Sequence, residues 1–289
     1  MGMFSFLGKN KTDQTPPSLE DVIEWFEGAT PQPVLKLQAT DQPATVFDSK
    51  LGGTPYLPPG FDYPYNQNPD ANQRPLRLLA QLNFAQLPQL PGFPTDGILQ
   101  FYLPYEHSED TYGANFDDLT TPLAFRVVYH DSVVEDQAAL LQPPSMAVSD
   151  GASFPLDGEF ALEATLTAHP MTPCDFRFDD FFLPGYNQAM ETDIEDLSEL
   201  EDGSYDTIFD VLSEGGHQVG GYPHFTQIDP RAEDQALQEH TVLLLQVDSD
   251  FVGDEEINWG TSGVANFFIT PEALARRDFS NVIFTWDCF

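Results

Sequence analysis

Apolar residues follow a helical spacing near the start of the chain and form only short runs further on. Ser18 is a residue type that caps helices, and acidic residues follow it. Val22, Ile23 and Phe26 then fall on one face, which predicts a short amphipathic helix. From about Val34 onward, 25 prolines and 20 glycines, counted over the whole chain, break the apolar runs. This punctuation favours strands joined by turns.

Later segments refine this pattern. Residues 125–129 and 160–166 are typical of strands. Residues 191–214 are acidic and contain no basic residue, and apolar residues recur at helical spacing in their second half. We therefore expect a loop followed by a docked helix there. Thr270-Pro271 begins a last short helix, and residues 281–286 predict a terminal strand.

Three short motifs occur twice in the same order and with similar spacing. The pairs are Gly52-Gly-Thr-Pro-Tyr56 with Gly220-Gly-Tyr-Pro-His224, Leu78–Asn83 with Leu243–Asp248, and Gly97–Leu103 with Gly263–Ile269. Each copy combines a glycine turn, a buried strand that ends in a polar pair, and a second apolar strand. The repetition predicts an internal duplication.

The expected fold is α+β and β-rich, internally duplicated, with two related β-sheet halves and a few short helices. We expect the halves to meet near their Gly-Gly turns. Residues 1–33 would form a lead-in and helix, and residues 34–289 one domain. Within that domain we expect the following parts: copy one at about 47–103, intervening strands and an acidic helix at 104–216, copy two at about 217–269, and a terminal helix and strand at 270–289.

The charge balance restricts the partners of the protein. The 47 acidic and 11 basic residues give a formal net charge of −36. Such a surface repels nucleic acid and anionic lipid, and it attracts basic proteins or cations. A basic protein partner and an adaptation to salt without any partner both explain the charge. The oligomeric state stays open.

The chain is expected to be cytoplasmic. Its two cysteines, Cys174 and Cys288, are far apart and have no paired motif, which is typical of a reduced compartment. The first residues place a short apolar run before the lysines, the reverse of a secretory signal. The chain has no apolar run of the length that spans a membrane.

Four segments carry a family resemblance: residues 52–58, 79–84, 220–227 and 278–288. They resemble the YwqG-like family, a bacterial domain of unknown function. The resemblance covers about residues 45–289. It implies a β-rich α+β fold, and it implies no activity and no catalytic residues.

Catalytic motifs are incomplete. Gly260-Thr-Ser-Gly263 resembles a serine turn, but Val264 stands where the last glycine is needed. The cysteines lack a thiol-protease context, and phosphate-binding glycine patterns are absent. These failures favour a protein that is not an enzyme, although they leave the question open.

An acidic loop gives the main enzymatic alternative. Residues 248–253 begin like a calcium-binding loop, but Val252 and Trp259 occupy positions that need oxygen ligands. No dedicated cofactor is expected. A divalent cation could still be held by Asp248, Asp250 and Asp254. The alternative function is therefore a cation-dependent hydrolase that uses Asp and Glu near residues 248–259.

The leading hypothesis is a non-catalytic binding or interaction protein. Aromatic and amide side chains beside proline turns often line binding clefts, although they also pack the turns of their own sheets. The candidate binding residues are Tyr56, Gln81, Asn83, Tyr222, His224, Gln246, Asp248, Trp259 and Asn266.

Overall fold

A computed structural model of the chain describes residues 16–68, 74–105, 111–122, 124–146, 154–201 and 203–289. In this part of the chain, ten strands form one large curled antiparallel sheet, in the order β12-β11-β8-β7-β1-β6-β2-β3-β4-β5. A small second sheet pairs β9 with β10. No helix among these residues is long and apolar enough to cross a membrane.

The strands and helices have the following bounds. The strands are β1 (Gln32–Thr40), β2 (Lys50–Gly52), β3 (Arg77–Asn83), β4 (Ile98–Leu103), β5 (Arg126–His130), β6 (Glu159–His169), β7 (His217–Gly220), β8 (Val242–Asp248), β9 (Asp250–Val252), β10 (Glu255–Ile257), β11 (Val264–Ile269) and β12 (Ile283–Asp287). The α-helices are α1 (Leu19–Ala29), α2 (Phe178–Met190), α3 (Ser204–Leu212), α4 (Pro230–Glu233) and α5 (Pro271–Ala275). The 3-10 turns are η1 (Gln137–Ala139), η2 (Leu197–Glu199) and η3 (Gln235–Leu237).

The long antiparallel pair β1–β6 forms the centre of the sheet and separates its two halves. On the β1 side, Gly220 pairs with Val34, close to the start of β1. On the β6 side, Gly52 pairs with Glu159, beside the other end of β1. The two Gly-Gly turns therefore lie at opposite ends of the central pair. The expectation that the halves meet at these turns is wrong.

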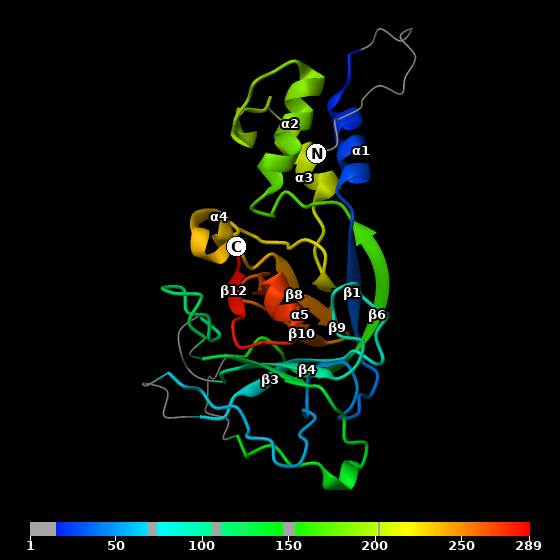
Figure 1. Ribbon diagram of the computed structural model, residues 1–289, viewed down its shortest axis with the longest axis vertical. Helices are drawn as coiled ribbons and strands as arrows, with labels where there is room; N and C mark the ends of the chain where they lie inside the picture. Colours follow the sequence, from blue (N-terminus) through cyan, green and yellow to red (C-terminus); the bar gives the residue numbers. More distant parts are fainter. Residues whose placement is uncertain (1–15, 69–73, 106–110, 123, 147–153, 202) are drawn as a thin grey trace.

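The sheet curls so that its two halves face each other across the main hydrophobic core (Figure 1). The ring of Phe101 on β4 lies 4.9 Å from that of Phe267 on β11. The ring of Phe125, just before β5, lies 5.4 Å from that of Phe284 on β12. The curl thus brings the two end strands of the sheet, β5 and β12, towards one another.

Helices α1, α2 and α3 form a helical lobe at one end of the molecule (Figure 1). The predicted first helix is confirmed, with a capping box formed by Ser18 and Asp21. Its Phe26 ring packs edge-on against Phe178 of α2 at 5.1 Å. The helix predicted in the acidic segment is α3, which buries Ile208 and Leu212.

Candidate functional site

Three of the predicted binding residues hold a main-chain turn in the β2–β5 half. Gln81 accepts a hydrogen bond from Tyr56 N at 2.9 Å, and its own amide donates to the carbonyl oxygens of Val46 and Asp48. Asn83 donates to the carbonyl oxygen of Phe47 at 2.8 Å. Tyr56, Gln81 and Asn83 are buried. Their polar groups are therefore engaged inside the fold.

Gln100 on β4, which sequence reasoning missed, completes this network. Its Nε2 donates to the Tyr56 carbonyl and to Gln81 Oε1, both at 2.8 Å. Its Oε1 accepts from the Tyr102 hydroxyl and lies 2.9 Å from His130 Nε2. Burial lowers the pKa of His130 to about 4, so this imidazole is neutral at pH 7. The network locks the turn and exposes no reactive group.

A second group of predicted residues surrounds His224 in the β7–β12 half. His224 N donates to Gln246 Oε1, and Asn266 donates to the His224 carbonyl, both at 2.8 Å. Gln246 in turn donates to the carbonyl oxygen of Gly216 at 2.7 Å. The structure thus divides the predicted site into two buried groups, one at each Gly-Gly turn.

The His224 side chain contacts two residues that are not among the predicted binding residues. Its Nδ1 lies 3.3 Å from Ser213 Oγ and 3.7 Å from Cys174 Sγ. Burial lowers the pKa of His224 and raises the pKa of Cys174 to about 11. The thiol therefore stays protonated at pH 7, and a thiolate nucleophile is not prepared here.

The candidate metal ligands are engaged separately. Asp248 Oδ2 accepts from Gly216 N at 2.6 Å, whereas Asp250 Oδ2 lies 3.5 Å from His217 Nε2. Among the residues that the structure describes, no three His, Cys, Asp or Glu side chains, Asp254 included, are grouped so that they could hold a metal ion. The hydrolase alternative gains no geometric support and stays a prediction, which metal analysis of the purified protein would test.

The two other predicted aromatic residues, Trp259 and Tyr222, are packing residues. Trp259 is fully buried, with its ring 5.3 Å from Tyr112 and 6.2 Å from Phe284. Tyr222 is buried and donates its hydroxyl to the Thr30 carbonyl at 2.9 Å. Both side chains are therefore engaged inside the fold.

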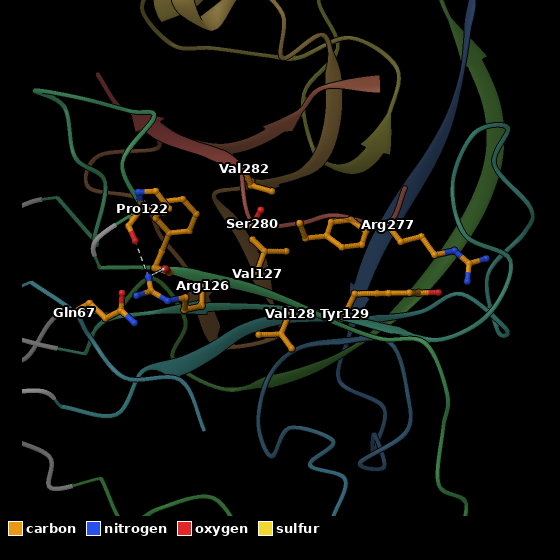
Figure 2. A pocket seen from close by; sticks show the side chains of 11 residues that line it. Gln67, Pro122, Arg126, Val127, Val128, Tyr129, Arg277, Ser280 and Val282 are labelled. Carbon is orange, nitrogen blue, oxygen red and sulfur yellow. Dashed lines mark hydrogen bonds between the residues drawn. The ribbon is translucent and has the colours of Figure 1, made fainter. Parts of the chain in front are cut away.

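A pocket of about 530 Å³ lies elsewhere, beside the edge strand β5. Figure 2 shows β5 on one side and the segment that leads into β12 on the other. The volume falls within the usual range for small-ligand sites. The described residues that line it are Gln67, Pro122, Phe125, Arg126, Val127, Val128, Tyr129, Arg277, Phe279, Ser280 and Val282.

The pocket combines apolar walls with two positive charges. Phe125 and Val282 belong to the main core, so these walls are held by the curl of the sheet. Arg126 and Arg277 lie at opposite ends of the β5 segment (Figure 2). None of the described lining residues is acidic. This is a marked contrast in a chain with 47 acidic and 11 basic residues.

Arg126 is partly buried and has no carboxylate partner among the described residues. Its Nη1 donates to the carbonyl oxygens of Pro122 and Phe125. Within the described chain, no Asp or Glu lies at ion-pair distance from it. Burial lowers the pKa of Arg126, because the charged form is desolvated without compensation. An anion placed beside this guanidinium would supply that compensation.

Arg277 marks the other end of the pocket. Its guanidinium lies 5.7 Å from the centre of the Tyr129 ring, and its Nη1 is 4.0 Å from Asp96 Oδ1. Both side chains of that ion pair are largely exposed, so the pair contributes little energy. The Tyr129 hydroxyl donates to the Asp96 carbonyl, which fixes the ring against the pocket.

The comparisons with known proteins identify the family of the chain and add no activity. No curated protein matches the chain. The model of a family described as a domain of unknown function, DUF1963, matches residues 49–288. This span begins just before β2 and includes both halves of the sheet and the pocket. The chain therefore belongs to the DUF1963 family.

Proposed function

We propose that this is a non-catalytic cytoplasmic binding protein whose ligand occupies the pocket beside β5 and carries an anionic group. One observation carries the proposal: two of the 11 basic residues line this pocket, and no described acidic residue does. Chance placement in a chain of net charge −36 would favour acidic residues there. The two free cysteines fit a reducing compartment.

The chemistry of the pocket suits recognition. The hydroxyls of Tyr129 and Ser280 already donate to the Asp96 carbonyl and the Asp278 carboxylate. Burial raises the pKa of Tyr129, which keeps its hydroxyl neutral. Apolar walls with a few charged groups bind an amphipathic ligand and orient its anionic end.

A matched pair of small molecules tests this proposal. We expect 4-phenylbutyrate to bind and its neutral counterpart, 4-phenylbutanamide, to bind about tenfold more weakly, because a charge-assisted hydrogen bond is lost. Arg126→Gln and Arg277→Gln should each weaken the binding of 4-phenylbutyrate by a similar factor. Titration followed by amide chemical shifts in NMR spectra measures both affinities and locates the site.

Arg276→Gln is the control, because Arg276 is exposed, neighbours Arg277 and does not line the pocket. This variant should bind like the wild type. Thermal unfolding of each variant separates lost binding from lost folding. Equal affinities for the acid and the amide, or equal losses in Arg276→Gln and Arg277→Gln, would refute an anion-selective pocket.

A basic protein partner is the second candidate function, and the helical lobe favours it. Its acidic residues from Glu191 to Asp210 are exposed where the structure describes them, and residues 191–214 contain no basic residue. The apolar side chains of Tyr205 and Val211 are exposed on the same lobe. Acidic charge beside exposed apolar groups suits a basic amphipathic surface.

Neutralising the lobe tests this second candidate. A partner retained at physiological salt should be lost when Asp193, Glu195 and Asp210 are changed to their amides. The control neutralises three exposed acids elsewhere, Asp131, Glu135 and Glu239, and should retain it. Equal retention by both variants, or no partner at low or physiological salt, would count against a basic partner.

We also propose that the halves of the sheet arose by duplication and that the chain is YwqG-like. The strand order supports duplication, since β2-β3-β4-β5 flank β6 as β7-β8-β11-β12 flank β1. Gln81 and Gln246 also accept from the N–H of corresponding motif residues, Tyr56 and His224. A superposition of the halves that failed to align these two glutamines would contradict the duplication.

A further inference from the structure

The pocket follows the free edge of β5. In the described chain, β5 pairs only with β4 and ends the ten-stranded sheet. The pocket contacts four consecutive residues of this strand, Arg126 to Tyr129. Successive side chains of a strand point to opposite faces, so a cavity that contacts four in a row lies along the edge, beside the main chain. An added strand would occupy that position.

The hydrogen-bond pattern of β3, β4 and β5 leaves the main-chain groups of two β5 residues pointing out from this edge. Phe84 N donates to the Gly97 carbonyl, so the main-chain N–H and C=O groups of Gly97 point towards β3. By alternation, the main-chain groups of Leu99 also point towards β3. Tyr129 lies opposite Leu99 in a regular β4–β5 register. The main-chain groups of Tyr129 and of Val127 therefore point away from β4. No hydrogen bond from another described segment reaches the main chain of either residue.

The two arginines lie on opposite faces of this edge. Val128 packs with the small cluster around Tyr102, and alternation places Arg126 on that face. Tyr129 packs against the main core on the other face, and Arg277 lies over its ring. In a strand alongside β5, residues opposite Arg126 and Tyr129 are three positions apart and also point to opposite faces.

Resting on the pocket function proposed above, we infer that the ligand is an extended acidic peptide that adds a strand to β5. Its main chain pairs with Val127 and Tyr129. Two acidic side chains, three positions apart, reach Arg126 and Arg277, and the residues between them contact the apolar walls. Main-chain pairing supplies affinity in this mode of recognition, and the flanking charges supply specificity.

The probe is an acetylated and amidated hexapeptide, Thr-Glu-Val-Val-Glu-Thr, which has the same order in either direction. With the whole chain at about 0.3 M salt, which screens the negative charge of the protein, we expect saturable binding. Hydrogen exchange of the Val127 and Tyr129 amides should slow by about tenfold or more at saturation, since both become hydrogen-bonded. NMR measures these two amides individually.

Three changes separate strand addition from simple charge attraction. Replacing both glutamates by glutamine should weaken binding by about tenfold or more. Placing the glutamates together at the centre, with the same composition, should weaken it comparably. One of the two successive valine N–H groups faces β5, so methylating both valine nitrogens must remove that donor, and it should abolish the slowed exchange. On the protein, Val127→Pro removes an outward N–H at an edge position that tolerates proline.

Each outcome bears on one proposal. If the hexapeptide binds without slowing exchange at Val127 and Tyr129, strand addition is wrong. If 4-phenylbutyrate binds in the pocket and the hexapeptide does not, strand addition fails and the pocket function stands. If neither binds, both fail. Slow exchange of the same two amides that grows with protein concentration alone would identify a second copy of this chain as the occupant and overturn the inference.

Discussion

Replacing Gln100 by leucine should lower the free energy of unfolding by roughly 3–5 kcal/mol. Gln100 is fully buried and bonds to groups of other buried residues. Leucine would strip a partner from the carbonyl of Tyr56, the hydroxyl of Tyr102 and the ring nitrogen of His130. Each buried polar group left without a partner costs about 1–3 kcal/mol. Urea unfolding with linear extrapolation measures the loss.

Asn266→Leu is the matched control on the other half of the sheet. Asn266 lies opposite Gln246 as Gln100 lies opposite Gln81. It makes one described hydrogen bond, to the His224 carbonyl, and its buried Oδ1 has no partner in the described chain. Its replacement should therefore cost only about 1–2 kcal/mol. Equal losses in the two variants would contradict the network as the reason for the difference.

The elements that the sequence predicted correctly are those set by neighbouring residues. Ser18 and Asp21 cap the first helix within one turn, and the spacing of Ile208 and Leu212 marks the buried face of α3. The β-rich character also follows from the prolines and glycines that interrupt the short apolar runs. Such features depend on a few adjacent positions, which a single sequence displays directly.

The error about the Gly-Gly turns has a different origin. Their separation depends on β1 pairing with β6 along its whole length, from Gln32 opposite His169 to Thr40 opposite Ala161. The partners are remote in sequence, and no local pattern states their register. The matching motifs did not indicate that the two Gly-Gly turns lie at opposite ends of the central β1–β6 pair.

The pocket was missed for the same reason. It exists because β5 ends the sheet and because the curl brings the segment of Arg277 towards Arg126. The predicted binding residues, such as Gln81 and Trp259, are polar or aromatic residues buried by packing. A usable signal was present in the composition. In a chain with 47 acidic and 11 basic residues, a local group of arginines without acidic neighbours marks a place for an anion.

Arg231→Met should destabilise the protein by about 3–5 kcal/mol, because it leaves the buried Asp229 carboxylate without its close cation. Arg231 is fully buried, and its Nη2 lies 2.7 Å from Asp229 Oδ2 and 3.7 Å from Asp175 Oδ2. Its Nη1 donates to the His240 carbonyl, and its guanidinium covers the Phe268 ring at 3.9 Å. The variant loses the ion pair, this hydrogen bond and the ring contact together.

A double variant separates the charge from the packing. Asp229→Asn combined with Arg231→Met removes both charges of the close pair, so it should be less destabilised than the two single losses added together. Arg276→Met, at an exposed position, should change the unfolding free energy by no more than about 0.5 kcal/mol. A loss below about 1 kcal/mol in Arg231→Met would mean that Asp229 is held by its other donors, the N–H groups of Phe176 and Arg231. In that case the buried ion pair would contribute little to the fold.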